Sequence, residues 1–122
     1  MNTVGWQKLE GGVIALAGLV IALLVSPGWA WWVWILLLLA PDLSMVGYLA
    51  GPRIGAQVYN LTHLYALPFL LMVLGVAAGA PALIAAGGLW LAHVGADRAL
   101  GFGLKEAAGF AHTHLGRIGR GG

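Results

Sequence analysis

Long apolar runs separated by short turns dominate the chain. No charged residue occurs between Glu10 and Asp42, and between Arg53 and Asp97 the ionisable side chains are two histidines and two tyrosines. The first interval has room for one membrane span of about 20 residues and most of another, and the second has room for two. The runs are continuous rather than alternating, so barrel strands are not expected. The pattern therefore predicts an integral membrane protein of the all-α class.

The positions of proline and glycine divide the runs into four transmembrane helices. Tight turns are predicted at residues 26–28 and 79–81, and Gly51-Pro52 ends the second run. Short connections make sequential helices antiparallel. We therefore expect a four-helix bundle in residues 1–100 and a polar, Gly-rich tail in residues 101–122. The predicted spans are residues 11–25, 29–51, 54–78 and 82–100, with Pro41 interrupting the second.

The composition excludes several classes of protein and site. Of the 122 residues, 61% are hydrophobic and 8% are charged, whereas about 25% charged residues is usual in soluble domains. Cysteine is absent, which excludes disulfides, thiolate metal sites and cysteine nucleophiles. A net charge of +2 does not argue for nucleic acid, and the expected partner is the lipid bilayer. We expect the first apolar run to be a retained span rather than a cleaved signal peptide.

The basic residues all fall on one side of a four-span chain. The turns at residues 26–28 and 79–81 carry neither Lys nor Arg. The positive-inside rule then places the basic side, with both termini, in the cytoplasm. We expect a multi-pass protein of the bacterial inner membrane. The basic residues are Lys8, Arg53, Arg98, Lys105, Arg117 and Arg120.

Small residues recur at a spacing of four. Glycine accounts for 20 of the 122 residues, and Gly88, Ala92 and Ala96 repeat on one predicted helix face. Such spacing lets two helices approach closely. We expect this packing to occur within one chain, and a homo-oligomer through these faces is the alternative.

Four ionisable side chains are predicted to lie at one depth. At about 1.5 Å per residue, Asp42 lies about 21 Å from the outer end of its span, His63 about 26 Å, His93 about 18 Å and Asp97 about 24 Å. The hydrocarbon core is about 30 Å thick, so all four fall in one layer towards the cytoplasmic side. His93 and Asp97 are four residues apart and therefore share a helix face. The layer draws on three different helices.

This layer has the chemistry of a metal site. Imidazole and carboxylate suit zinc or another divalent metal, and two histidines with two aspartates would make a four-ligand set. One open position would let a bound water attack an ester or phosphoester. Asn60 would orient that water or the substrate. Arg98 would neutralise a phosphate, with its own position at the lipid boundary of the layer.

Other interpretations of the same residues stay open. The layer would serve as a structural or ligand-binding hydrogen-bond network without a metal, with Asp97 paired to Arg98 or Arg53. Proton or small-ion transport is a further alternative, although the outer halves of the spans lack ionisable residues. In the tail, His112 and His114 would either join the layer or titrate in solvent. The preferred interpretation is a small multi-pass membrane protein with a polar site, and the metal-dependent membrane hydrolase is the alternative.

A string of motifs carries a family resemblance. The motifs are Ala40-Pro41-Asp42-Leu43-Ser44-Met45-x-Gly47-Tyr48, Tyr59-Asn60-x-x-His63, His93-x-x-x-Asp97-Arg98-x-x-Gly101-x-Gly103-x-Lys105 and His112-x-His114-Leu115-Gly116-Arg117. With them the chain resembles the bacterial family of small multi-span membrane proteins catalogued as domain of unknown function 4260. The resemblance covers nearly all of the chain from Ala40 onward and implies a membrane fold with no established activity. The chain departs from the pattern at Glu106-Ala107-Ala108, where an aromatic residue is expected after the lysine.

A weaker similarity is to metal-dependent hydrolases of the inner membrane. Those proteins carry a Pro-Asp-x-Asp step, a Thr-His-Ser step and a later His-x-x-x-Asp step. The step from His93 to Asp97 fits, but Ser44 stands in place of the second aspartate and Leu64 in place of the serine. The similarity implies a metal-dependent hydrolase, and the missing aspartate argues against a two-metal mechanism.

Overall fold

The computed structural model describes residues 1–106 and 109–118, and it confirms the predicted all-α membrane bundle. Three segments of this part of the chain are long and apolar enough to cross a membrane: Thr3–Val25, Trp31–Ala50 and Pro52–Ala77. The fourth helix of the bundle is α5. The helices are α1 (Thr3–Val25), α2 (Trp31–Leu39), the 3-10 helix η1 (Ala40–Ala50), α3 (Pro52–Thr62), α4 (Ala66–Ala77) and α5 (Pro81–Leu100).

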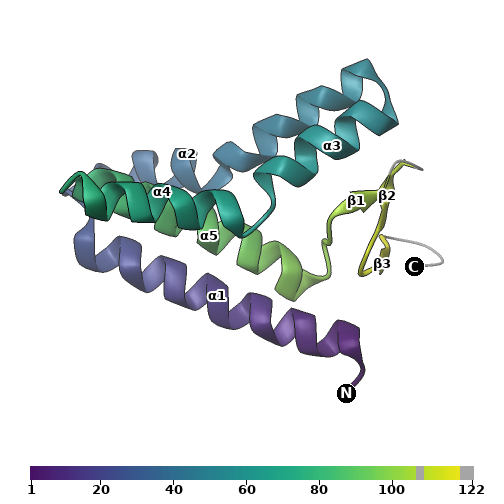
Figure 1. Ribbon diagram of the computed structural model, residues 1–122, viewed down its shortest axis with the longest axis horizontal. Coiled ribbons are helices and arrows are strands. Elements are labelled where there is room, and N and C mark those ends of the chain that lie inside the picture. Colours follow the sequence, from purple (N-terminus) through teal and green to yellow (C-terminus); the bar gives the residue numbers. More distant parts are fainter. Residues whose placement is uncertain (107–108, 119–122) are drawn as a thin grey trace.

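Helix α5 passes through the middle of the bundle, between α1 and α4 (Figure 1). Its contact with α1 depends on glycine. A Cβ atom added at Gly88 would lie 2.7 Å from the carbonyl oxygen of Gly18, and one added at Gly95 would lie 2.6 Å from that of Gly11. No side chain fits at these distances, so the two backbones touch. The small residues are used for packing within the chain, as the sequence predicts.

The first span is longer than predicted, and the next two are irregular. Helix α1 begins at Thr3 rather than near residue 11, because the side chain of Asn2 caps it by accepting from the backbone N–H of Gly5. The second span changes from α-helix to 3-10 helix at Ala40, next to Pro41, which has no N–H to donate.

The third span is two helices rather than one. It breaks at residues 63–65, between α3 and α4. Pro68 stands in the first turn of α4, where the missing N–H is not needed. A continuous helix would have placed Pro68 in the interior, where it would have displaced a hydrogen bond.

Helices η1 and α3 form a hairpin that leaves the bundle at an angle (Figure 1). They meet at Gly51, whose φ of 110° is accessible to glycine and strained for other residues. Gly55 packs against the ring of Tyr48, and Gly47 packs against Val58. The hairpin starts where the second span becomes a 3-10 helix and ends where the third span breaks, so both irregularities lie at one level.

The tail folds back under the bundle as a small antiparallel sheet of β1 (Lys105–Glu106), β2 (Gly109–Thr113) and β3 (Gly116–Arg117), in the order β1-β2-β3. The turn is made at Gly101, which ends α5 with a left-handed φ of 90°. The sheet and the N-terminus lie at the same end of the molecule (Figure 1). The sequence did not predict these strands. Ala107, Ala108 and Arg120 lie outside the described residues.

Candidate metal centre

The four ligands predicted from the sequence meet at one point. Asp42 lies in the first turn of η1, His63 caps the end of α3, and His93 and Asp97 lie one turn apart on α5. One ligand atom from each residue lies within 4.8 Å of all the others. We call these four residues the Asp/His cluster. The structure thus brings together the layer that helix geometry predicted.

The spacing of the ligand atoms matches a tetrahedral site. His63 Nε2 lies 3.2 Å from Asp42 Oδ1 and 3.5 Å from Asp97 Oδ2. His93 Nε2 lies 3.0 Å from Asp42 Oδ1 and 3.3 Å from Asp97 Oδ2. The two Nε2 atoms are 3.3 Å apart. Ligands about 2.0 Å from a tetrahedral zinc ion are separated by about 3.3 Å. Five of the six separations are therefore close to that value, and all six are within 4.8 Å.

Backbone carbonyls fix the protonation of both imidazoles. His63 Nδ1 lies 2.8 Å from the carbonyl oxygen of Tyr59, and His93 Nδ1 lies 2.7 Å from that of Leu38. A carbonyl only accepts hydrogen bonds, so each Nδ1 carries the proton and donates. In the neutral ring each Nε2 then presents a lone pair towards the centre of the cluster. This is the arrangement that orients metal-binding histidines.

The carbonyl of Leu38 is available because of the change in helix type. In an α-helix it would accept from the N–H of Asp42, four residues on. In the tighter 3-10 pairing its partner would be the nitrogen of Pro41, which has no hydrogen. His93 takes the vacant position. The break in the second span therefore supplies both a ligand, Asp42, and the group that orients another.

The cluster is closed on the imidazole side and open on the carboxylate side. The side chain of His63 is fully buried and that of His93 is 6% exposed, whereas Asp97 is 18% and Asp42 38% exposed. The carboxylates face a cavity of about 310 Å³. Its lining residues are Asp42, Met45, Tyr59, Asp97, Phe102, Lys105 and Ile118.

Aromatic side chains pack around the cluster. The ring of Tyr59 stacks on the imidazole of His63 with centroids 3.7 Å apart, and its hydroxyl donates to Asp97 Oδ2 at 3.5 Å. Trp90 Nε1 donates to the carbonyl oxygen of Thr62 at 2.7 Å. The break between α3 and α4 thus receives a side-chain donor, as irregular backbone within a membrane requires.

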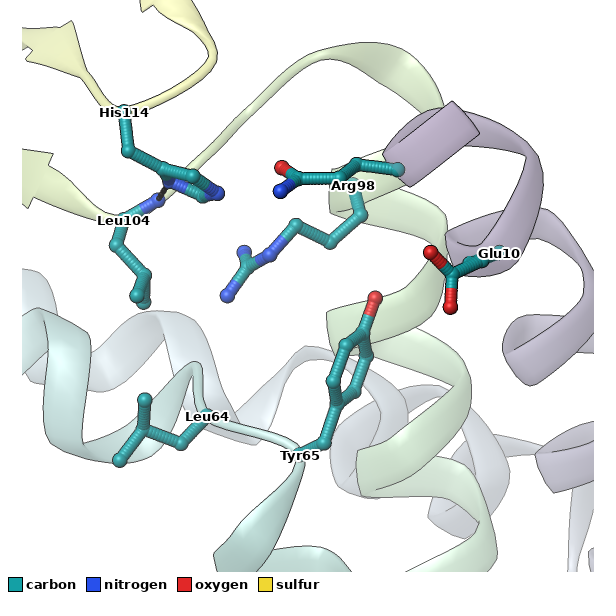
Figure 2. Close-up of a pocket in the computed structure, with 7 residues that line it drawn as sticks. Glu10, Leu64, Tyr65, Arg98, Leu104 and His114 are labelled. Atoms are coloured by element: carbon teal, nitrogen blue, oxygen red, sulfur yellow. Dashed lines mark hydrogen bonds between the residues drawn. The ribbon is translucent and has the colours of Figure 1, made fainter. Parts of the chain in front are cut away.

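Arg98 is buried, which corrects the expectation that it lies at the lipid boundary. It is 5% exposed, and its guanidinium donates to the carbonyl oxygens of His63 at 2.7 Å and Phe102 at 3.3 Å. Figure 2 shows it in a second cavity of about 300 Å³, between Tyr65 and His114. Arg98 therefore fixes the backbone of His63, one of the four cluster residues. Its role towards a phosphate stays a prediction.

Asn60 contacts the tail rather than the cluster. Its side-chain amide donates to the carbonyl oxygen of Lys105 at 2.7 Å and accepts from the backbone N–H of Lys105 at 2.5 Å. Asn60 thus pairs with β1 as a strand would. The ammonium of Lys105 lies 4.9 Å from the ring centroid of Tyr59. Burial lowers the pKa of Lys105, and Asp97 and Asp42 oppose that shift.

The tail histidines do not join the cluster. His114 Nδ1 accepts from the backbone N–H of Leu104 at 2.8 Å, the bond drawn in Figure 2. Burial and the positive charge of Arg98 lower the pKa of His114. Within the described part of the chain, Asp97 makes its ion pairs with His63 and His93 rather than with an arginine.

Sequence reasoning missed three residues that build the site: Tyr59, Trp90 and Lys105. A signal existed for the first, since Tyr59 precedes His63 by four residues and so shares its helix face. Trp90 carried no signal, because tryptophan in an apolar helix is common. The contribution of Lys105 depends on how the tail folds back, and no local pattern predicted that.

A known protein family matches nearly the whole chain. The family described as a domain of unknown function (DUF4260) matches residues 4–118. The resemblance seen in the motifs is thereby confirmed, whereas the weaker similarity to hydrolases stays a prediction. No curated protein and no solved structure matches the chain.

Proposed function

The chain belongs to the DUF4260 family, and we propose that it is a multi-pass membrane protein that binds one divalent metal ion in the Asp/His cluster. One observation carries this proposal. Two imidazole nitrogens whose ring protons go to backbone carbonyls point their lone pairs at each other from 3.3 Å, beside two carboxylates. A cation between them, either a metal ion or a shared proton, stabilises buried acceptors arranged in this way.

A metal ion accounts for the distances better than ion pairs do. Hydrogen bonds between a protonated imidazole and a carboxylate are usually about 2.7–2.9 Å long. The four nitrogen–oxygen distances in the cluster are 3.0, 3.2, 3.3 and 3.5 Å. These values suit ligands held apart around a common ion. Two nitrogens and two oxygens in tetrahedral array favour zinc over magnesium or calcium, which prefer six or more oxygens.

A metal-dependent hydrolase is the second candidate, and the open carboxylate side favours it. A metal ion there would have room for a water that it activates for attack on an ester or phosphoester. The cavity beside Asp42 and Asp97, of about 310 Å³, is at the lower end of the size usual for ligand pockets. The adjoining bilayer would make a lipid-like substrate accessible.

The orientation belongs to the same proposal, with the cluster and both termini on the cytoplasmic side of the bacterial inner membrane. The chain has no cysteine, so single cysteines can be placed at will. Thr3 is the first residue of α1, and Ala30 lies just before α2, beyond the other end of α1. Thr3→Cys and Ala30→Cys therefore report on opposite sides of the membrane. In intact cells a membrane-impermeant maleimide should label Ala30→Cys and spare Thr3→Cys. The reverse pattern would invert the orientation without affecting the metal site.

Metal analysis tests the proposal directly. Protein purified without chelators and then dialysed should retain about one zinc ion per chain, and chelation should lower its melting temperature because a ligand that binds the folded state stabilises it. His93→Ala should bind no ion, and His114→Gln, a histidine outside the cluster, should bind as the parent does. Absence of stoichiometric metal, together with a melting temperature unchanged by chelation, would refute metal binding and leave the hydrogen-bond network.

A further inference from the structure

The cavity that contains Arg98 shares no lining residue with the cavity at the Asp/His cluster. Helix α1, the break between α3 and α4, the last turn of α5 and the tail all contribute to its walls. It holds a cation, Arg98, and an anion, Glu10, and both act electrostatically on Tyr65, which also lines it. Figure 2 shows the three side chains around one space. The cavity therefore has a positive part and a negative part.

The guanidinium of Arg98 is buried, and within residues 1–106 and 109–118 no carboxylate forms an ion pair with it. Two of its five N–H groups donate to the carbonyl oxygens of His63 and Phe102. Carbonyl oxygens carry no net charge. Asp97 acts on Arg98 electrostatically but makes its ion pairs with the cluster histidines. Since Arg98 lines the cavity, its other N–H groups can donate to an anion there.

His114 adds a second donor on the side of Arg98. Its Nδ1 accepts from the backbone N–H of Leu104, so in the neutral ring the proton is on Nε2, which donates. Figure 2 shows the imidazole pointing towards the guanidinium of Arg98. A helix and the tail thus each bring a donor to the positive part of the cavity. Two donors from separate segments suit the several oxygens of a phosphate group.

The charged residues of this cavity lie at the depth of lipid head groups. Glu10 directly precedes the apolar run that begins at Gly11, and Arg98 lies in the last turn of α5. A Cβ atom added at Gly11 would lie 2.5 Å from Cβ of Arg98, so the two charged residues lie at one level. Trp6, one turn before Glu10, is 55% exposed, as is usual for indole rings at the membrane interface. Lipid phosphates lie just outside the hydrocarbon core.

We propose that this cavity binds a phosphate ester that also carries an ammonium group, the chemistry of an ethanolamine phospholipid head group. The phosphate accepts from Arg98 and His114, and the ammonium pairs with Glu10. This ligand is neutral overall, as the Arg98 and Glu10 charges are together. A phosphate ester without the ammonium would bring a second negative charge towards Glu10, which disfavours it. The metal ion has no part in this site.

Native mass spectrometry of the full chain in a maltoside detergent provides the test. The probes are phosphatidylethanolamine and phosphatidylglycerol with identical acyl chains, together with free phosphoethanolamine. The parent should prefer phosphatidylethanolamine by about tenfold to a hundredfold, the range for a hydrogen bond between charged groups. Glu10→Gln should abolish this preference. Glu106→Gln, the matched loss of a carboxylate that does not line the cavity, should keep it.

The phosphate side is tested separately. His114→Ala should weaken the binding of both lipids alike by about twofold to tenfold, the value of one neutral hydrogen bond. Arg98 is left intact in these variants, because its bonds to His63 and Phe102 also hold the backbone.

The outcomes identify the source of the ligand and separate this site from the metal site. Binding of free phosphoethanolamine that depends on Glu10 points to a soluble source, and binding of the lipid alone points to a head group; either supports the inference. Equal affinity for the two lipids in the parent, a preference that survives in Glu10→Gln, or no binding of any probe would overturn it. Zinc binding should be the same in Glu10→Gln and the parent, so each proposal can fail without the other.

Discussion

The region around Ala22, Ala85 and Leu89 and the region around the Asp/His cluster are built from the same helices in different ways. In the first, small residues let α1 and α5 touch, and Trp29 and Leu37 pack against the buried core. The helices there are regular, and their backbone groups pair within each helix. Stability at this end comes from close packing, as is usual inside membranes.

At the cluster the helices are interrupted, and side chains donate hydrogen bonds to backbone carbonyl oxygens. The carbonyls of Leu38, Tyr59 and His63 accept from His93, His63 and Arg98 respectively. Each of these bonds holds a cluster residue or its backbone. Interruption of the helices therefore supplies orienting carbonyls at Leu38 and His63, whereas the carbonyl of Tyr59 accepts from both the backbone N–H and Nδ1 of His63.

The largest expected effect comes from removing a ligand at constant shape. Asp97→Asn should lower zinc affinity by more than about a hundredfold, because losing even an outer partner of a metal ligand costs about 10- to 100-fold. Competition titration with a chromophoric chelator measures this. Glu10→Gln, which removes a carboxylate outside the cluster, should bind zinc normally, and equal weakening in both variants would show a general charge effect.

A change in the region where α1 and α5 pack should lower stability and leave zinc binding intact. Gly88→Ala places a methyl group 2.7 Å from the carbonyl oxygen of Gly18, and such overpacking costs about 1–3 kcal/mol. The melting temperature should fall while one zinc ion still binds. At Gly12 the nearest atom would be 3.9 Å away, so Gly12→Ala should be neutral or stabilising by up to about 1 kcal/mol. Loss of zinc in Gly88→Ala would mean that the two regions are not separable.

Releasing the tail is expected to have an intermediate, local effect. Asn60→Ala removes two hydrogen bonds to the backbone of Lys105, each worth about 0.5–1.5 kcal/mol. Hydrogen exchange at the Lys105 amide should accelerate while the amides of α5 keep their protection. Exchange that accelerates throughout α5 would show that the tail is part of the cooperative core.

The smallest effect should be on pH dependence. Burial and Arg98 lower the pKa of His114 below its usual value of 6.5, so the unfolded tail takes up protons first as the pH falls. The contribution of His114 to the stability of the tail is then fully present above about pH 6.5 and declines as the pH falls through the lower folded value. Hydrogen exchange at Leu104, whose N–H bonds to His114, should accelerate on acidification. In His114→Gln this acceleration should shrink, and an unchanged profile would point to another group.

The predictable part of the site came from counting residues along helices. The positions of Asp42, His63, His93 and Asp97 in their spans sufficed to predict a common layer, because rise per residue is constant and the turns were clear. The helix breaks were harder. The sequence predicts an interruption at Pro41. It does not predict the break at residues 63–65, which comes shortly before Pro68. The tail sheet and the burial of Arg98 depend on tertiary contacts with no local pattern.

X-ray absorption at the zinc edge tests most directly whether two imidazole nitrogens and two carboxylate oxygens hold a metal ion in the Asp/His cluster. Zinc-loaded protein should give a first shell of about four nitrogen and oxygen atoms at about 2.0–2.1 Å, with the outer-shell scattering of two imidazoles. His63→Ala and His93→Ala should each abolish that signal. A zinc spectrum without imidazole scattering, or one unchanged in both variants, would contradict the account.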